Sequence, residues 1–355
     1  MTIARRAEAR PTLDALEFFD AATAAFARAG ARVGVREHDL DVAGTRVRLR
    51  FAGSALEGRL LPALAHVRAA GIEGADVALT VSCFDSATTA VRMPPPPWSR
   101  ADHGPKGEIV GFNDDRIRTV FEPGVDVLNL YDEQRRAAVY WVAAPDVVPW
   151  WESSFPFRTI LHWWAVPTSL QPLHAGCVGR HGRGVLVAGE SGAGKSTTTL
   201  AALEAGLDYA GDDYVLVDTE ACTAYSLYST AKLATDNLER FPALVPLVAN
   251  ADRLDREKAM VFLHDHRPEH LAAELRLTSI VVPRVTGRPA SRLEPTSPAA
   301  ALRALAPTTS FHLPGYGREV FAKLTRLVRA LPCHRLDAGT DLEELAAVLA
   351  TLTTP

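Results

Sequence analysis

The sequence predicts an α/β protein with two domains, and three observations lead to this fold class. Its 355 residues suffice for two hydrophobic cores, and 47% apolar and 23% charged residues are values typical of globular proteins. Amphipathic helical stretches and short β-branched runs are mixed along the chain. One apolar run leads straight into a glycine-rich loop and then a helix, as in phosphate-binding loops. We expect a mixed α/β domain over residues 1–150 and a phosphate-loop domain over residues 151–355.

The N-terminal 150 residues contain the elements of the mixed α/β domain. Residues 13–29 carry apolar side chains at helical spacing, and Gly30 stands where that helix would stop. Two extended runs flank a helical stretch over residues 60–70, and three further runs separated by turn residues predict an antiparallel meander. These five runs are residues 45–51, 76–82, 116–121, 127–131 and 137–142.

Two further segments are rich in proline or tryptophan. Four consecutive prolines in Met93–Trp98 predict a stiff exposed loop, and the alternative is a ligand for a partner's aromatic groove. Four tryptophans flank residues 155–162, where aromatic side chains most simply pack a helix. A base-stacking platform is the alternative there, but no basic groove accompanies it. The tryptophans are Trp150, Trp151, Trp163 and Trp164.

The glycine-rich loop matches the pattern Gly-x-x-x-x-Gly-Lys-Ser/Thr at each fixed position. The apolar run 184–188 precedes it, and residues 197–205 continue as a helix that Gly206 would end. Glycines allow consecutive backbone N–H groups to turn toward phosphate oxygens at the positive end of that helix. We therefore expect Lys195 to reach the β and γ phosphates and Ser196 to ligate Mg²⁺. The expected nucleotide-binding residues are Gly189, Glu190, Ser191, Gly192, Ala193, Gly194, Lys195, Ser196 and Thr197.

Two acidic residues, Asp212 and Asp213, follow 17 and 18 positions after Lys195. Neighbouring residues of a strand point to opposite faces, so both can face a triphosphate only if the chain bends there, which Gly211 would permit. One carboxylate could then accept the proton of an attacking hydroxyl while the other holds Mg²⁺. The alternative is a turn in which the two side chains cap backbone amides.

His174 lies 15 residues before the loop, in the apolar segment 173–179. If this segment is a strand that returns through residues 179–184 to the strand before the loop, the hairpin brings His174 near the phosphates. A histidine in an apolar segment can also have a purely structural role.

His174, the loop Gly189–Ser196 and Gly211-Asp212-Asp213 together resemble the catalytic domain of the HPr kinase/phosphorylase family. Members carry a His-Gly motif 15 residues before the loop and an acidic pair at the next strand, share their fold with phosphoenolpyruvate carboxykinase, and transfer the γ phosphate of ATP to a protein serine. The resemblance implies a P-loop kinase domain of this type with Asp212 as the base. Lys195 and the loop would hold the phosphates, Ser196 would bind Mg²⁺, and His174 would line the site; Asp213 is then left as the second Mg²⁺ ligand.

The resemblance covers residues 173–217 and is loose elsewhere. His174 is followed by Ala-Gly, and residues 227–233 stand where the bifunctional enzymes carry a glycine-rich signature. The resemblance therefore does not imply phosphorylase activity or the usual protein substrate. Lys232, Arg284 and Arg288 could approach the phosphates, but we expect them at the surface, where long basic side chains on loops usually lie. The C-terminal runs 276–282, 319–330 and 340–352 predict a strand and two helices.

Charge and composition limit the partners. The net charge is −4, the sequence pI is near 6.3 and no dense Lys/Arg run occurs, which argues against nucleic acid. The start lacks the apolar stretch of a signal peptide, and no stretch approaches the roughly 18 apolar residues of a membrane span, so we expect a cytoplasmic protein without a membrane partner. The four cysteines form no Cys-x-x-Cys pair and should be reduced thiols.

These observations predict a phosphotransferase, a serine-kinase-like enzyme that uses ATP and Mg²⁺. Its acceptor would be a hydroxyl of a protein, a peptide or a small molecule. Two alternatives stay open: a nucleotide-binding regulator with little or no transfer, and carboxykinase-type or pyrophosphate chemistry on a small acid. Hexamers occur in the resembling family, so the resemblance allows a homo-oligomer.

Overall fold

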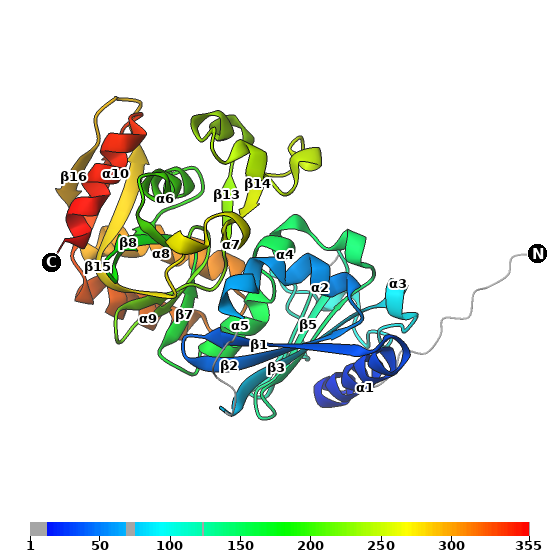
Figure 1. The fold of residues 1–355 in the computed structure, drawn as a ribbon. Coiled ribbons are helices and arrows are strands. Elements are labelled where there is room, and N and C mark those ends of the chain that lie inside the picture. Colours follow the sequence, from blue (N-terminus) through cyan, green and yellow to red (C-terminus); the bar gives the residue numbers. More distant parts are fainter. Residues whose placement is uncertain (1–12, 69–74, 123, 355) are drawn as a thin grey trace, which may run out of the picture. The chain divides into compact units, whose positions relative to one another are not determined.

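The computed structural model describes residues 13–68, 75–122 and 124–354. It is an α/β structure with mixed sheets, whose helices and strands are shown in Figure 1. The chain separates into two compact units, the first comprising Met1–Glu37, Arg48–Glu57 and Leu79–Val148 and the second His38–Val47, Gly58–Ala78 and Pro149–Pro355. This division lies close to residue 150 but assigns two earlier segments to the second unit. One of them makes local contacts there, since the Ala63 carbonyl accepts a hydrogen bond from the Ser229 N–H at 2.9 Å.

The N-terminal part of the chain forms a six-stranded sheet of order β1-β2-β3-β6-β5-β4. Strands β4, β5 and β6 form the predicted antiparallel meander, and β3 pairs with β6 in parallel. The sequence pattern misses β1, because five of its eight residues are charged or histidine and no apolar run marks it. The strands are β1 (Val35–Val42), β2 (Thr45–Ala52), β3 (Val77–Asp85), β4 (Ile117–Glu122), β5 (Val127–Asp132) and β6 (Ala137–Val142).

Helix α1, Ala15–Val33, begins at a capping box in which Asp14 and Glu17 exchange hydrogen bonds of 2.8 and 2.9 Å. The prediction that this helix stops at Gly30 is wrong. One interior glycine costs only about 1 kcal/mol, and the helix ends instead at Gly34, whose φ of 82° no helix can continue.

The helix predicted over residues 60–70 is two short pieces. These are α2, Ala55–Leu60, and a 3₁₀ helix, Pro62–Val67, because a proline cannot continue the hydrogen bonding of the preceding turn. Residues 69 and 70 of that prediction lie outside the described residues. A third short helix, α3, covers Ser86–Thr89.

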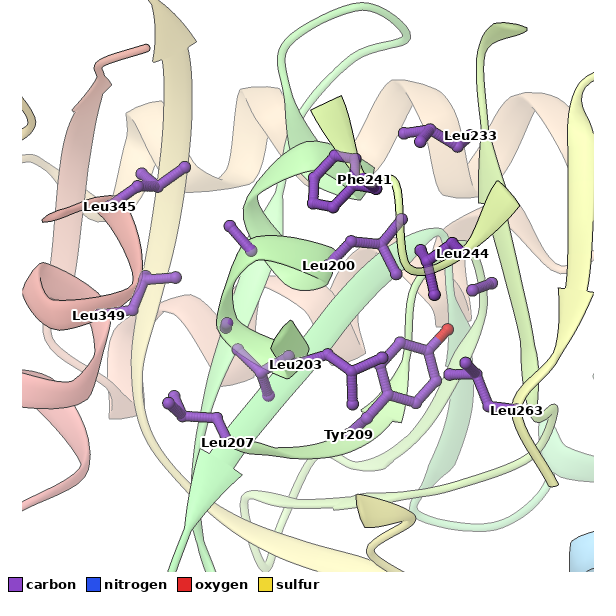
Figure 2. Packing of buried hydrophobic residues seen from close by; sticks show 14 of the residues in the cluster. Leu200, Leu203, Leu207, Tyr209, Leu233, Phe241, Leu244, Leu263, Leu345 and Leu349 are labelled. Carbon is purple, nitrogen blue, oxygen red and sulfur yellow. The ribbon is translucent and has the colours of Figure 1, made fainter. Parts of the chain in front are cut away.

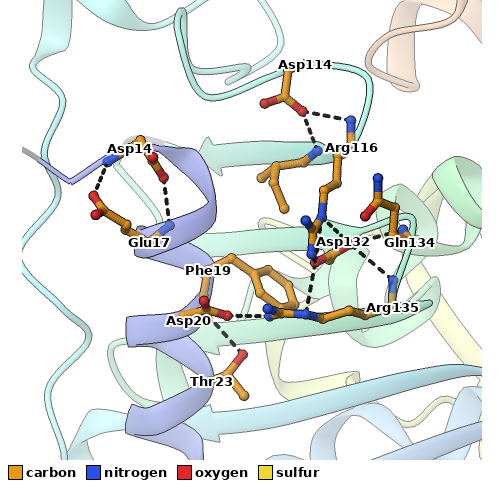
Figure 3. A network of polar contacts seen from close by, with 11 residues as sticks. Asp14, Glu17, Phe19, Asp20, Thr23, Asp114, Arg116, Asp132, Gln134 and Arg135 are labelled. Carbon is orange, nitrogen blue, oxygen red and sulfur yellow. Dashed lines mark hydrogen bonds and ion pairs between the residues drawn. The ribbon is translucent and has the colours of Figure 1, made fainter.

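A polar network joins α1 to the turn between β5 and β6 (Figure 3). The buried carboxylate of Asp132 accepts hydrogen bonds from the Arg116 guanidinium at 2.8 and 3.1 Å and from the backbone N–H groups of Gln134 and Arg135. The Arg135 side chain also pairs with Asp20 of α1. Burial raises the pKa of Asp132, but Arg116 and the other donors outweigh burial and hold that pKa below its usual value. These contacts anchor α1 on the meander.

The proline-rich segment lies outside any helix or strand, as predicted. Its middle prolines are exposed, whereas Trp98 at its end is buried against Phe18, with ring centroids 4.8 Å apart. The tryptophans beyond residue 149 belong to two short helices, α4 (Trp150–Ser154) and α5 (Arg158–Ala165). Trp163 is buried, which confirms a packing role for this residue of the tryptophan group.

The second unit is built on a nine-stranded mixed sheet. Its order is β10-β8-β9-β15-β12-β11-β7, with β17 paired to β15 and β16 to β17. Strand β15 runs parallel to β9 and β17, and the other pairs are antiparallel. The strands are β7 (Leu170–Leu173), β8 (Ala175–Arg180), β9 (Arg183–Ala188), β10 (Asp208–Gly211), β11 (Val215–Asp218), β12 (Thr223–Tyr225), β15 (Glu274–Val285), β16 (Arg292–Pro295) and β17 (Cys333–Ala338). A separate two-stranded sheet pairs β13 (Thr230–Leu233) with β14 (Ala259–Phe262).

Helices cover both faces of the nine-stranded sheet, and each face has its own core. Neighbouring residues of one strand, such as Val185 and Leu186, belong to different cores, because successive side chains point to opposite faces. One core contains residues of α6 (Lys195–Glu204) and α10 (Leu342–Ala350), and the other contains residues of α8 (Pro298–His312) and α9 (Gly317–Ala330). The runs 319–330 and 340–352 are therefore helical as predicted, while α8, which contains Pro307, is missed by the pattern.

Figure 2 shows the first of these cores around α6. Leu200 and Leu203 of α6 lie among Leu345 and Leu349 of α10 on one side and Phe241 on the other. A short helix, α7 (Leu263–His266), adds Leu263 to the same core. This packing fixes the start of α6 relative to the sheet. No helix among the described residues has the length and apolar character needed to cross a membrane.

Candidate functional site

The glycine-rich loop lies between β9, which ends at Ala188, and α6, which begins at Lys195. Gly194, directly before the helix, has a φ of 100°, in the left-handed region that other residues rarely adopt, and a Cβ at this position would lie 3.2 Å from Val285 Cγ2. Within the part of the chain that the structure describes, no side chain caps the start of α6. The loop therefore has the strand, turn and helix order that leaves backbone N–H groups for an anion.

A cavity of about 560 Å³ opens beside the loop. One wall consists of loop and helix residues from Ser191 to Thr198, and a second contains His174 and Asp213. A third wall comes from residues 232–240 and Lys258, and a fourth from Val285 and residues 338–340. The predicted loop, histidine and one predicted aspartate thus face one space.

The Lys195 side chain is nearly buried and lies over its own loop. Its ammonium group donates to the carbonyl oxygens of Gly189 at 2.8 Å and Glu190 at 3.2 Å. An ammonium group has three N–H donors, so one remains for a ligand oxygen in the cavity. Burial lowers the pKa of Lys195, and the carboxylates of Asp213 and Asp212 offset part of that effect.

His174 and the acidic pair lie close together because the strands on either side of His174 pair with the strands on either side of the acidic pair. Strand β8 pairs with β10 through Cys177 and Gly211, and β7 pairs with β11 through Leu173 and Val215. His174 joins β7 to β8 and therefore lies opposite the bend at residues 212–214. The predicted hairpin of β8 and β9 is also present, with Ala175 opposite Ala188, so His174 is next to the start of the loop.

Asp213 faces the cavity and is held from two sides. Its Oδ1 lies 2.9 Å from His174 Nε2, and its Oδ2 accepts a hydrogen bond from the Lys232 ammonium at 2.8 Å. Burial raises the pKa of Asp213, but the Lys232 ammonium and the His174 ring outweigh burial and hold that pKa well below its usual value. Asp213 is therefore an ionised carboxylate at neutral pH.

Asp212 is 1% exposed and is not among the residues that line the cavity. Its Oδ1 accepts a hydrogen bond from the Thr199 hydroxyl at 2.8 Å, and its Oδ2 accepts one from the backbone N–H of Lys232 at 3.2 Å. Burial, followed by the Asp213 charge, raises the pKa of Asp212 to about 6, against the opposing effect of these hydrogen bonds and of Ser196. The two neighbouring carboxyl groups thus have different surroundings and different proton affinities.

The prediction that Lys232 is a surface cation is wrong. Lys232 is 5% exposed and lies in strand β13, with its ammonium 4.3 Å from the ring centroids of both Trp150 and Phe155. Burial lowers its pKa, and Asp213 raises it in part. One signal could have identified it: a single lysine within the otherwise uncharged run Leu227–Leu233, next to the predicted site in the chain. Arg284 and Arg288 are exposed, as predicted, and Arg284 pairs with Asp337.

The sequence also gives no hint of Thr199 as a site residue. Its methyl group packs against Gly176, where a Cβ would lie 2.4 Å from Thr199 Cγ2, and its hydroxyl then reaches Asp212. The glycine that follows His174 by two residues thus allows helix α6 to approach β8 closely. The roles of Asp212 as base, Asp213 and Ser196 as metal ligands and His174 as a catalytic residue stay predictions.

No family model matches the sequence, and no curated protein is significantly similar to it. Among solved structures, the chain is similar to the HPr(Ser) kinase/phosphatase from Coxiella burnetii. The sequence identity is 12% and the TM-score 0.26, over 51% of this chain and 93% of the other. At these values the likeness establishes neither family nor activity, and the function has to be inferred from the geometry of the site.

Proposed function

We propose that this protein is an ATP-dependent phosphotransferase that moves the γ phosphate to a hydroxyl group. The observation that supports this function is the convergence of three features on one cavity. They are the uncapped helix start behind the glycine-rich loop, the Lys195 ammonium, and the ionised Asp213 carboxylate. The first two can bind phosphates, and the third can act on the group that attacks them.

The residues at the loop fit a nucleotide triphosphate and Mg²⁺. Backbone N–H groups of the loop and the remaining donor of Lys195 would hold phosphate oxygens. The Ser196 hydroxyl and the Asp213 carboxylate supply oxygen ligands, which Mg²⁺ prefers. When bound, Mg²⁺ would neutralise the charge that develops on the phosphates.

The two carboxyl groups of the acidic pair would have different roles. Asp213 lines the cavity, and each of its oxygens keeps a lone pair that could orient a hydroxyl or a metal ion. Asp212 contacts Thr199 of α6 and Lys232 of β13 from behind, so this geometry favours a supporting role for it. The base assigned to Asp212 by resemblance would then act only after a rearrangement that opens it to the cavity.

Transfer of label from γ-labelled ATP tests the proposal. Purified protein with Mg²⁺ is incubated with and without cell extract, alongside Lys195→Ala, Asp213→Asn, Asp212→Asn and, as a control, Arg329→Ala on the exposed side of α9. We expect label on an acceptor with the wild type and the control. Loss of Lys195 or Asp213 should slow transfer by about 100-fold or more, as removal of one charge-stabilising group does in other enzymes. Equal labelling by wild type and Lys195→Ala would contradict the proposal.

A second function, nucleotide binding for regulation without transfer, is favoured by one observation. Both carboxyl groups of the acidic pair already accept hydrogen bonds from protein donors. A regulator needs only that nucleotide shifts the population of two conformations. MgATP binding without label transfer under any condition would support this function over the first.

A further inference from the structure

One residue, Lys232, contacts both carboxyl groups of the acidic pair with two different donors. Its side-chain ammonium donates to Asp213 Oδ2 at 2.8 Å, and its backbone N–H donates to Asp212 Oδ2 at 3.2 Å. A hydrogen bond from a charged donor to a carboxylate is shorter and stronger than one from a neutral amide. The side-chain contact therefore restrains Asp213 more tightly than the backbone contact restrains Asp212.

Two aromatic rings hold the Lys232 ammonium in place. The ring centroids of Trp150 and Phe155 each lie 4.3 Å from it, a distance at which the negative faces of the rings attract a cation. We call these two residues the aromatic cage. The Phe155 ring is itself packed against Tyr214, 5.1 Å away, and Tyr228, 5.5 Å away. The cage is thus fixed to the residue after Asp213 and to the segment that leads into β13.

Burial of the Lys232 ammonium costs free energy that other contacts must offset. A lysine ammonium that is 5% exposed loses most of its hydration, and this loss must be offset by the Asp213 charge and the two rings. Lys258, which lines the same cavity, is by contrast exposed. The cage therefore distinguishes Lys232 from a cation that merely adds positive charge to the cavity.

We propose that Lys232 is a positioning residue for Asp213, held by the aromatic cage so that the Asp213 carboxylate stays aimed into the cavity. This inference rests on the proposed function, because it gives Asp213 the carboxylate that acts on the ligand. Lys232 acts through Asp213 and not by touching the phosphates itself. It follows that Lys232 and the cage matter only while Asp213 is present.

A double-mutant cycle on MgATP affinity, measured by isothermal titration calorimetry, tests this dependence. In the wild-type background, Lys232→Met should weaken MgATP binding and raise the Kd by about tenfold. This is in the range of coupling energies between contacting residues. In the Asp213→Asn background the same substitution should change it by no more than about twofold. Multiplicative effects in the two backgrounds, or no effect in either, would overturn the proposal. Lys258→Met is the matched control and should give the same Kd change in both backgrounds.

The cage supplies a second pair of variants in case Lys232→Met does not fold. Trp150→Leu removes one ring and should reproduce the direction of the Lys232→Met effect, while Trp150→Phe keeps an aromatic face and should restore most of the wild-type affinity. Equal effects of the leucine and phenylalanine variants would count against the cage.

Failure of the proposed function is distinguished by a measurement without nucleotide. The emission of Trp150, isolated by subtracting the Trp150→Phe spectrum, should shift in Lys232→Met and also in Asp213→Asn, because either change alters the cation beside the indole ring. If the wild type binds no MgATP but both shifts occur, the proposed function fails and the positioning contact stands. An unchanged spectrum in Asp213→Asn would overturn the positioning contact itself.

Discussion

The side chains of Asp212 and Asp213 show how strongly local surroundings separate two adjacent identical residues. Asp213 has a cationic partner and faces the cavity, whereas Asp212 has neutral donors and is buried behind it. Burial and the neighbouring charge raise the pKa of Asp212 to about 6, from an ordinary value of 3.8. Folding therefore favours the protonated form of Asp212.

This difference predicts how the stability of the protein depends on pH. A carboxyl group whose pKa is higher in the folded state does not lower the free energy of unfolding below its unfolded pKa of 3.8. As the pH rises from 3.8 to about 6, the group destabilises the fold increasingly, and above about pH 6 the full destabilisation is present. Because Asn does not titrate, the stability of Asp212→Asn relative to the wild type should increase between pH 5 and pH 8, by about 1 kcal/mol. Urea denaturation at the two pH values checks this. A difference between variant and wild type that is independent of pH would contradict it.

At the scale of single residues, the sequence predicts the positions of the loop and of the histidine better than that of the lysine. The spacing of Gly189, Gly194 and Lys195 is local, so a pattern along the chain is enough to find it. Lys232 and Thr199 reach the site through strand pairing and helix packing, which no local pattern records. A buried lysine is also rare enough that the surface is the default expectation.

At the scale of elements, the site depends on the close contact between α6 and β8. Gly176 in β8 leaves room for Thr199 of α6, whose hydroxyl then donates to Asp212. The hairpin, the loop strand and α6 could be predicted because their periodicity and stop signals are clear. The pairing of β8 with β10 and of β7 with β11 could not be predicted, because these strands are distant from each other in the chain.

A methyl group at Gly176 should disturb this contact. The Cβ of Gly176→Ala would lie 2.4 Å from Thr199 Cγ2 and 3.3 Å from the Asp212 carbonyl oxygen, so helix or strand must move. We expect the free energy of unfolding to fall by about 1–3 kcal/mol, as overpacking of a well-packed contact does. Chemical denaturation measures it, with Gly317→Ala at the start of α9 as the control, since a Cβ there meets nothing within 4 Å. Equal stability of Gly176→Ala and the wild type would show that α6 and β8 are not packed this closely.

At the scale of the whole molecule, the sequence predicts an α/β chain with a phosphate loop in its C-terminal part, and the structure is α/β with mixed sheets. The segments before residue 79 are harder to assign, because the described residues within the stretches 38–47 and 58–78 belong with the C-terminal unit. Such contacts join residues far apart in the chain, so composition and periodicity carry no trace of them. The assignment of residues 1–150 to a separate domain stays a prediction.

The cavity beside Gly189–Ser196 should bind the phosphates of a nucleotide, and calorimetric titration with MgATP measures this binding. The wild type and the Arg329→Ala control should bind with equal affinity, and Lys195→Ala should bind at least about tenfold more weakly because it loses a charge-assisted contact to the phosphates. Absence of MgATP binding by the wild type, or equal affinity in Lys195→Ala, would show that the loop is not a phosphate-binding site.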